Sequence, residues 1–279
     1  MEKTQAPKKS KKGLVIGIIV LLVLAGAGYA FYAVTGSSTV KAQVHVESGS
    51  VSVNGATAAG TVKLSEGDVI TTGSDGKATV VLYESTLISL EPDSQVTLDE
   101  LTKSHPKVSQ EGTTWTMFTK LAGAEAFSAK AGSTVASVRG TVFELSDGFI
   151  MTGEGTVTYN MEGQTFTVKT GQVVEDGVAR DATPEELASM TGFMNRAVGE
   201  LKHMRQLEID KHPTTYAMVK SMYGVDDAFI QNKLAEADAG MFNVDEFVLK
   251  SPVQMDSVDK IADITKTIQK VNEDIESMQ

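Results

Sequence analysis

The chain has 279 residues, no cysteine, 41% hydrophobic residues and a formal net charge of -11. This length allows one large domain or two small ones, and the apolar content is sufficient for a buried core. Without cysteine, disulfides, thiol catalysis and thiolate metal sites are excluded. The strong negative charge opposes binding to the phosphate backbone of nucleic acids.

The charges are unevenly distributed along the chain. Residues 1–12 contain five lysines and one glutamate, which gives this tail a net charge of +4. The other 267 residues hold 20 Lys and Arg against 35 Asp and Glu, a net charge of -15. We find no basic stripe in this acidic part, so we expect no nucleic-acid partner. The five lysines are Lys3, Lys8, Lys9, Lys11 and Lys12.

A membrane segment is predicted directly after the basic tail. Residues 13–34 are apolar apart from Gly and Tyr, and residues 13–40 carry no charge. As a helix, this run is long enough to cross a hydrocarbon core of about 30 Å. Lysines before the segment predict a cytoplasmic N-terminus by the positive-inside rule. We therefore expect a single-pass protein of the cell membrane, with a cytoplasmic tail at 1–12, a linker at 35–43 and the bulk of the chain outside the cytoplasm.

A cleaved signal peptide is the alternative interpretation of the same segment. The small residues Gly28 and Ala30 flank Tyr29 in the pattern of a cleavage site. Apolar residues continue through Phe31 and Val34, however, which favours a membrane anchor.

Residues 44–177 have the pattern of an all-β domain. Short alternating segments rich in Gly, Ser, Thr and Val are separated by turn residues, as in residues 73–83. An internal similarity relates the start of this region, residues 49–70, to its end, residues 155–174. We expect a β-sandwich or jelly-roll-like fold in which the two related terminal units pair.

The same region resembles the FecR-like domain family. The resemblance rests on a G-D-x-[IL]-x-T-G turn, a run of the pattern dGs.l.L.p.s.l, a V-R-G-T-x-F strand and a closing G-x-V and G-Q pair. The matching positions are Gly67, Asp68, Thr72, Gly73, Leu87, Leu90, Pro92, Ser94, Val138, Arg139, Gly140, Thr141, Phe143, Gly155, Val157, Gly171 and Gln172. The resemblance to this family implies an extracytoplasmic β domain that follows a single membrane span.

Founding members of that family relay occupancy of an outer-membrane iron-siderophore receptor to a cytoplasmic sigma factor. Those transducers hold the sigma factor with a substantial helical region in the cytoplasm. Only 12 residues precede the apolar run in this chain, too few to fold into such a region. The resemblance therefore implies fold and topology more than it implies iron signalling.

Residues 183–279 have the pattern of an α-helical C-terminal domain. Thr183, Pro184 and Glu186 form a capping box that starts an amphipathic helix, which we expect to end before His212. Further helices are predicted at 214–223, 226–238, 244–250 and 256–278. The last helix carries a heptad seam suited to pairing with another helix. Its members are Ile261, Ile264, Ile268, Val271, Ile275 and Met278.

Eight of the twelve methionines follow residue 183. Their positions on apolar stripes favour a role in the core of a helical bundle. A docking surface for a protein partner is the alternative, since Met is frequent on adaptable binding surfaces.

We predict no catalytic, metal or cofactor site. The four histidines do not form a metal-binding pair on one helix, and no phosphate-binding or dinucleotide-binding pattern is present. Segments 74–77, 146–148 and 169–171 imitate the motif order of penicillin-binding serine enzymes, but Ser74 lies in a predicted turn. Arg139 is interpreted as a structural residue that binds loop carbonyls, or else as a contact for an anion. Trp115, the single tryptophan, is expected to anchor a core or interface.

Three functional hypotheses follow. The first is a non-enzymatic, membrane-tethered module for ligand sensing or protein interaction at the cell envelope. Its protein partner would bind the helical tail, and the C-terminal helix could pair two copies of the chain. The second is a transmembrane transducer that regulates a cytoplasmic transcription factor of sigma type. The third, least favoured, is a serine hydrolase acting on envelope polymers.

Overall fold

The computed structural model describes residues 42–211, 213, 217, 220–221, 224–241, 243–245 and 256–278. It divides into two compact units, one containing residues 38–200 and 273–279 and the other containing 201–272. The predicted membrane segment at 13–34 lies outside the described residues. Among the helices that are described, none is both long and apolar enough to cross a membrane.

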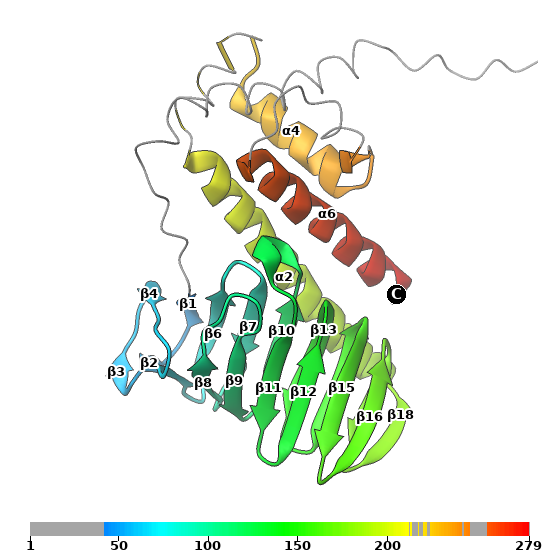
Figure 1. Ribbon diagram of the computed structural model, residues 1–279. Helices are drawn as coiled ribbons and strands as arrows, with labels where there is room; N and C mark the ends of the chain where they lie inside the picture. The colour runs from blue at the N-terminus through cyan, green and yellow to red at the C-terminus, as the bar shows by residue number, and fades with distance from the viewer. Residues whose placement is uncertain are drawn as a thin grey trace, which may run out of the picture. The chain divides into compact units, whose positions relative to one another are not determined.

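The first unit is built on two nine-stranded sheets (Figure 1). Sheet A has the strand order β18-β17-β14-β13-β10-β7-β6-β1-β4. Its strands, in chain order, are β1 (Ala42–Ser48), β4 (Thr61–Lys63), β6 (Lys77–Leu82), β7 (Thr86–Leu90), β10 (Thr114–Phe118), β13 (Thr141–Ser146), β14 (Phe149–Glu154), β17 (Gln172–Glu175) and β18 (Val178–Asp181).

Sheet B has the strand order β16-β15-β12-β11-β9-β8-β5-β2-β3. Its strands are β2 (Val51–Val53), β3 (Ala56–Thr57), β5 (Val69–Thr72), β8 (Gln95–Glu100), β9 (Lys107–Glu111), β11 (Phe127–Ala131), β12 (Thr134–Val138), β15 (Thr156–Met161) and β16 (Gln164–Lys169). A short 3₁₀ helix, η1 (Leu121–Gly123), precedes β11.

The chain alternates between the sheets and advances from one end of the sandwich to the other. Sheet A contains the hairpins β6-β7, β13-β14 and β17-β18, and sheet B contains the hairpins β8-β9, β11-β12 and β15-β16. The prediction that the terminal units pair is wrong, because β2 and β3 lie at the opposite end of sheet B from β15 and β16. Each unit pairs instead with its neighbours in the sequence.

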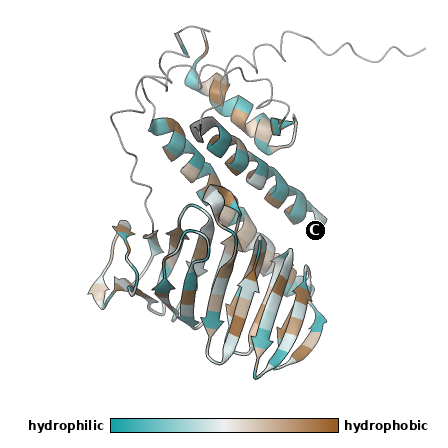
Figure 2. Ribbon diagram, in the orientation of Figure 1, coloured by the Kyte–Doolittle hydropathy of each residue, from teal (hydrophilic) through white to brown (hydrophobic). Residues whose placement is uncertain are grey.

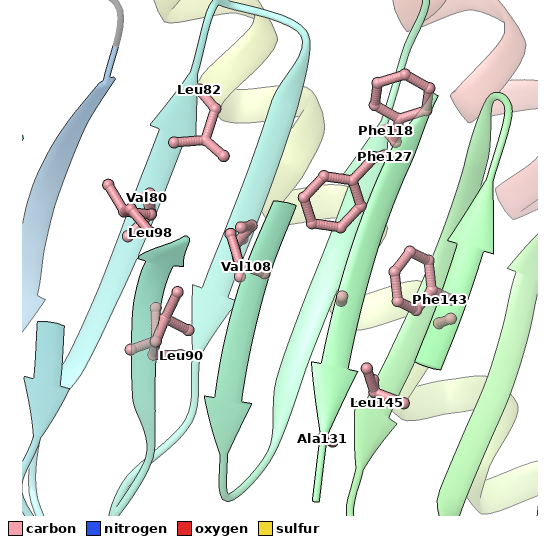
Figure 3. Packing of buried hydrophobic residues seen from close by; sticks show 14 of the residues in the cluster. Val80, Leu82, Leu90, Leu98, Val108, Phe118, Phe127, Ala131, Phe143 and Leu145 are labelled. Carbon is pink, nitrogen blue, oxygen red and sulfur yellow. The ribbon is translucent and has the colours of Figure 1, made fainter. Parts of the chain in front are cut away.

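The inner faces of the two sheets form the hydrophobic core. Strand residues alternate between apolar and polar along much of the sandwich (Figure 2), as expected where one face of a strand is buried. Figure 3 shows side chains from both sheets meeting between the layers. Phe127 packs near Phe118 and Phe143, with ring centroids 6.1 and 6.4 Å away. The predicted all-β region is confirmed.

The C-terminal helices agree with the predicted segments. The structure contains α2 (Pro184–Asp210), α4 (Asp227–Asp238) and α6 (Asp256–Ser277). The capping box at the start of α2 is formed, since the Glu186 backbone N–H donates to Thr183 Oγ1 and the Thr183 N–H donates to Glu186 Oε2. Most of the predicted helices at 214–223 and 244–250 lies outside the described residues.

A buried ion pair joins three helices within the unit 201–272. Arg205 of α2 donates to both carboxylate oxygens of Asp238 of α4, at 2.5 and 2.9 Å. It also donates to the Thr265 hydroxyl of α6 at 3.0 Å. All three side chains are buried. Removing Asp238 would therefore leave Arg205 buried without a carboxylate, whereas removing Arg205 would leave Asp238 with Lys202, 3.5 Å away.

Candidate functional site

The outer face of sheet A is apolar and buried. Every second residue of a strand in sheet A points into the core between the two sheets. The residues that alternate with these lie on the outer face, and many of them are also apolar and buried. Those residues are Val81, Leu87, Trp115, Met117, Val142, Met151 and Val173, each at most 7% exposed. A sheet face of this kind needs a cover, and the first part of α2 supplies it.

The N-terminal end of α2 is attached at β18 and β14. Arg180 of β18 donates to both carboxylate oxygens of Glu186, at 2.8 and 2.7 Å. One turn further along, the Met190 side chain occupies the space beside Gly153 of β14. A Cβ atom at position 153 would lie 2.5 Å from Met190 Sδ. Glycine is therefore what lets the helix approach the sheet this closely.

The next turns of α2 cross the middle of the sheet. The Phe193 ring lies 5.8 Å from the Trp115 ring of β10. Arg196 forms an ion pair with Glu91, which follows β7, at 3.4 Å. The helix thus crosses sheet A from β18 toward β6. Trp115 is 7% exposed and anchors this interface, as the sequence predicted.

A cavity of about 290 Å³ lies where α2 reaches β6 and β7. Thr79, Leu87 and Ser89 line it from the sheet, and Glu47 lines it from the end of β1. From α2 it is lined by Phe193, Arg196, Ala197, Gly199 and Glu200. We call this cavity the α2 pocket. It combines charged groups of both signs with an apolar wall.

The carboxylates near α2 differ in their electrostatic environment. Hydrogen bonds from Arg180 lower the pKa of Glu186 to about 2. Glu91 is balanced by Lys77, at 2.8 Å, as well as by Arg196. Glu144 of β13 has no positively charged partner among the described residues. Burial, together with the carboxylates of Glu186 and Glu91, raises the pKa of Glu144 to about 7.

Comparison with known protein families identifies the β region. Residues 68–173 match the family model described as FecR protein. This part of the chain is a FecR domain. The resemblance stated from the sequence is confirmed.

Comparison with individual proteins adds distant similarities. Among curated proteins, none matches the sequence. Two crystal structures that match, at 1.65 and 2.50 Å resolution, are of a protein described as a candidate anti-sigma factor from Parabacteroides distasonis ATCC 8503. The first is 16% identical, with a TM-score of 0.37, over 41% of this chain and 59% of that chain. The second is 14% identical, with a TM-score of 0.39, over 49% and 73%. The chain thus spans about three fifths of the first structure.

The first group of FecR motif residues closes a turn. Gly67 adopts a positive φ of 86°, and its N–H donates to the Leu98 carbonyl at 2.7 Å. The Asp68 carboxylate accepts hydrogen bonds from the Asn54 side chain and the Ser65 N–H, at 2.8 and 2.7 Å. The Gly73 N–H donates to the Ser50 carbonyl at 2.8 Å. These residues fix the connections at one end of the FecR domain.

The second group lies around β13. Phe143 is fully buried in the core, and Thr141 is 1% exposed. Gly140, with a φ of 91°, places its carbonyl so close to Gly155 that a Cβ there would lie 2.7 Å away. Arg139 lies in the bend between β12 and β13 and is exposed. It makes no hydrogen bond or ion pair with another described residue, so the predicted contact with loop carbonyls is not formed there.

The last motif pair closes the turn before β17. The Gly171 N–H donates to the Thr152 carbonyl at 2.8 Å. The Gln172 side-chain oxygen accepts from the Lys169 N–H at 3.1 Å. As in the other two groups, most of the motif residues of the FecR domain hold turns and core together. Of the motif positions, Leu87 alone lines the α2 pocket.

The seam of α6 is buried within the chain. Its exposed fractions do not exceed 6% at Ile261, Ile264, Ile268, Val271 and Ile275. Met190 and Met194 are likewise fully buried, whereas Met241 is 72% exposed. These residues are thus buried within the chain, and pairing of two copies through α6 stays a prediction.

No sequence motif pointed to the α2 pocket. Its charged residues come from two distant segments, Glu47 from the end of β1 and Arg196 with Glu200 from α2, and the strand that contains Ser89 has no unusual composition. Only the amphipathic stripe of α2 gave a usable signal, since it predicted a helix that needs a surface to cover. Within the described residues, no group of three or more His, Cys, Asp or Glu could hold a metal ion.

Proposed function

We propose that this chain is a non-enzymatic, single-pass FecR-type relay protein of the cell envelope. Its FecR domain lies outside the cytoplasm, anchored by residues 13–34. The proposal is supported by the FecR domain itself, by the basic tail before an apolar run, and by the acidic character of the remaining chain.

The observation that carries the relay function is the placement of α2. Its first part covers sheet A through Met190 and Phe193. Its last part, from residue 201, belongs to the second unit and holds the buried Arg205. A ligand that changes the docking of α2 therefore acts on a helix shared by both units. Such a ligand must bind the docked and undocked states with different affinity.

A reversible covalent lock tests the relay. In the double variant Gly153→Cys/Met190→Cys, the two side chains are close enough to form a disulfide. No other cysteine is present to compete. We expect the oxidised variant to reproduce the transcript profile of a strain lacking the protein, and reduction to restore the normal profile. Met190→Cys alone, given the same treatments, is the control. A normal profile in the locked strain would overturn the relay.

Cysteine labelling tests the topology. Thr165→Cys on β16 is exposed in the FecR domain, and Ser10→Cys lies in the basic tail. We expect a membrane-impermeant maleimide to label position 165 in intact cells and position 10 only after permeabilisation. The reverse pattern contradicts the proposed orientation. The mass of the mature protein distinguishes an anchor from a cleaved signal peptide.

Regulation of a cytoplasmic transcription factor is the second candidate, favoured by the FecR domain. It requires the basic tail to contact that factor. Replacing all five tail lysines by glutamine, in a variant shown to insert normally, is expected to alter transcription. An unchanged transcriptome counts against direct regulation of a transcription factor by the basic tail. In that case the relay would act through a protein partner in the envelope.

The helical tail is our proposed site for such an envelope partner. Leu207 and Met241 are exposed apolar residues of the unit 201–272, at 42% and 72%. A photo-crosslinker at position 241 is expected to trap a protein in intact cells, whereas one at the buried position 264 is not. Equal products from both positions, or trapping of a second copy alone, would contradict a distinct envelope partner.

A further inference from the structure

The α2 pocket has the size of a small-molecule site. Its volume of about 290 Å³ is near the lower end of ligand pockets in proteins. It lies between one helix and the sheet that the helix covers, and all its lining residues belong to the same compact unit. A folded partner or a polymer would not fit inside it, but a single small metabolite would.

The floor of the pocket contains two buried hydroxyl groups. Thr79 and Ser89 face each other on β6 and β7 and are 5% and 4% exposed. The Thr79 hydroxyl donates to the Glu47 carboxylate. The Ser89 hydroxyl, by contrast, forms no hydrogen bond with any described residue. The Ser89 oxygen is not among the buried side-chain atoms without a partner, so it keeps some accessible surface and can hydrogen-bond to a ligand in the pocket.

The wall formed by α2 presents two opposite charges that do not neutralise each other. Arg196 and Glu200 are four residues apart, on the same side of the helix, and both line the pocket. No ion pair joins them. Glu200 has no hydrogen bond or ion pair with the described residues. Arg196 has only the 3.4 Å contact with Glu91, a carboxylate that Lys77 already binds at 2.8 Å.

These charges match a ligand that carries both signs. A guanidinium binds a carboxylate through two parallel hydrogen bonds, and most of the donors of Arg196 are available for this. Glu47 at the end of β1 and Glu200 on α2 supply carboxylates that accept hydrogen bonds from an ammonium group. Phe193 and Leu87 form the apolar part of the lining, where a hydrocarbon side chain would be desolvated.

We propose that the α2 pocket binds a free α-amino acid. Arg196 takes the carboxylate, Glu47 and Glu200 take the ammonium group, and Ser89 hydrogen-bonds to the ligand at the floor. This inference rests on the proposed function, since it names the class of ligand whose binding would change the docking of α2. The ligand contacts both the sheet and the helix, so it stabilises the docked state.

Calorimetry on the full-length protein in detergent tests the proposal. Each common L-amino acid is titrated separately, and we expect saturable binding of at least one with an apolar side chain. The amide of that amino acid lacks the carboxylate, and its deaminated acid lacks the ammonium group. Each analogue is expected to bind about tenfold more weakly or worse. Absence of binding by every amino acid, or equal binding of either analogue, overturns the proposal.

Substitutions assign the binding to this pocket. Arg196→Gln, Glu200→Gln and Ser89→Ala are each expected to weaken binding, with the two charge removals costing about tenfold or more. Glu185→Gln, at an exposed position of the same helix, is the matched control and should bind normally. Thermal unfolding shows that each variant remains folded. Normal binding by both Arg196→Gln and Glu200→Gln would place the ligand elsewhere.

The two proposals fail in different ways. The disulfide lock between positions 153 and 190 involves no ligand, so it tests the relay independently of amino acids. If the lock silences the protein but no amino acid binds, the relay stands and the ligand assignment is wrong. If an amino acid binds but the lock has no effect, the pocket stands and the relay is wrong.

Discussion

Glu144 is a carboxylic acid held on the covered face of sheet A, where it meets the carboxylates of Glu91 and Glu186. Its cross-strand neighbours are the apolar residues Trp115 and Met151. Arg180 neutralises Glu186, and Lys77 neutralises Glu91, but no such group reaches Glu144 among the described residues. The folded protein therefore binds a proton at Glu144 more tightly than the unfolded chain does.

This raised pKa predicts a pH dependence of stability. The contribution of protonated Glu144 to the free energy of unfolding is fully present below pH 4.5, its ordinary pKa. This contribution is lost as the pH rises to about 7, the pKa of Glu144 in the folded protein. The shift corresponds to at most about 3 kcal/mol. Glu144→Gln should remove this loss and raise the melting temperature at pH 8, with Glu185→Gln as the control. Unfolding curves of wild type and Glu144→Gln with equal pH dependence between 5 and 7 would contradict the prediction.

Asp238 illustrates the opposite case of a buried charge with a good partner. Asp238→Asn leaves Arg205 buried and uncompensated, which is expected to cost about 3 to 5 kcal/mol in the free energy of unfolding. The double variant Arg205→Met/Asp238→Leu removes both charges and should recover most of that loss. Denaturant unfolding measures both. If the double variant were as unstable as Asp238→Asn, the loss would come from the missing ion pair itself and not from an uncompensated charge on Arg205.

At the scale of elements, the contact between α2 and sheet A depends on one small residue. In Gly153→Ala, the added methyl group overlaps the Met190 side chain, which is fully buried and cannot move away freely. We expect a loss of about 1 to 3 kcal/mol.

A glycine within α2 provides the matched comparison for Gly153. A Cβ at Gly192 meets only the end of the Arg196 side chain, 4.0 Å away. Gly192→Ala should therefore stabilise the protein by about 0.5 to 1 kcal/mol, because alanine favours the helix. Thermal unfolding of the two variants gives the comparison. The same direction of change in both would contradict the idea that α2 is closely packed against β14.

The helices were the elements that the sequence predicted best. Helix α2 begins at its capping box, and α4 and α6 agree with the predicted segments within a residue or two, because caps and periodicity are local signals. Most strands were recognisable for the same reason, but the predicted V-R-G-T-x-F strand is broken at Arg139 and Gly140, between β12 of sheet B and β13 of sheet A. The pairing of the strands was not recognisable, since it joins distant segments. β9 and β11 pair in parallel because β10 between them belongs to the other sheet.

The α2 pocket could not be predicted for a related reason. It forms only when residues near positions 47, 79 to 89 and 193 to 200 come together. None of these segments has an unusual composition. The FecR motif residues, which the sequence did reveal, mostly hold turns, and proteins that bind different ligands could have the same turns. A fold can therefore be recognised from sequence while its binding site remains hidden.

At the scale of the whole sandwich, stability should vary along the strand order. Central strands such as β10 are paired on both sides, whereas β3 and β18 lie at the edges. Val178 of β18 is 65% exposed. We expect hydrogen exchange to be slowest in β7, β10 and β13 and fastest at β3 and β18. Mass spectrometry of deuterated peptides measures this gradient. Uniform exchange would mean that the sandwich opens only as one unit.

The hairpin-by-hairpin path of the chain also has a consequence for biosynthesis. Each newly made hairpin can join an edge that earlier residues have already formed, so the sandwich can grow while the nascent chain is still emerging. The apolar outer face of sheet A has no cover until residues 184–200 follow. During that interval Trp115 and its neighbours face water, and a ribosome that stalls before α2 releases a product with a large adhesive surface. Helix α2 is therefore also the segment whose synthesis allows this apolar surface to be covered.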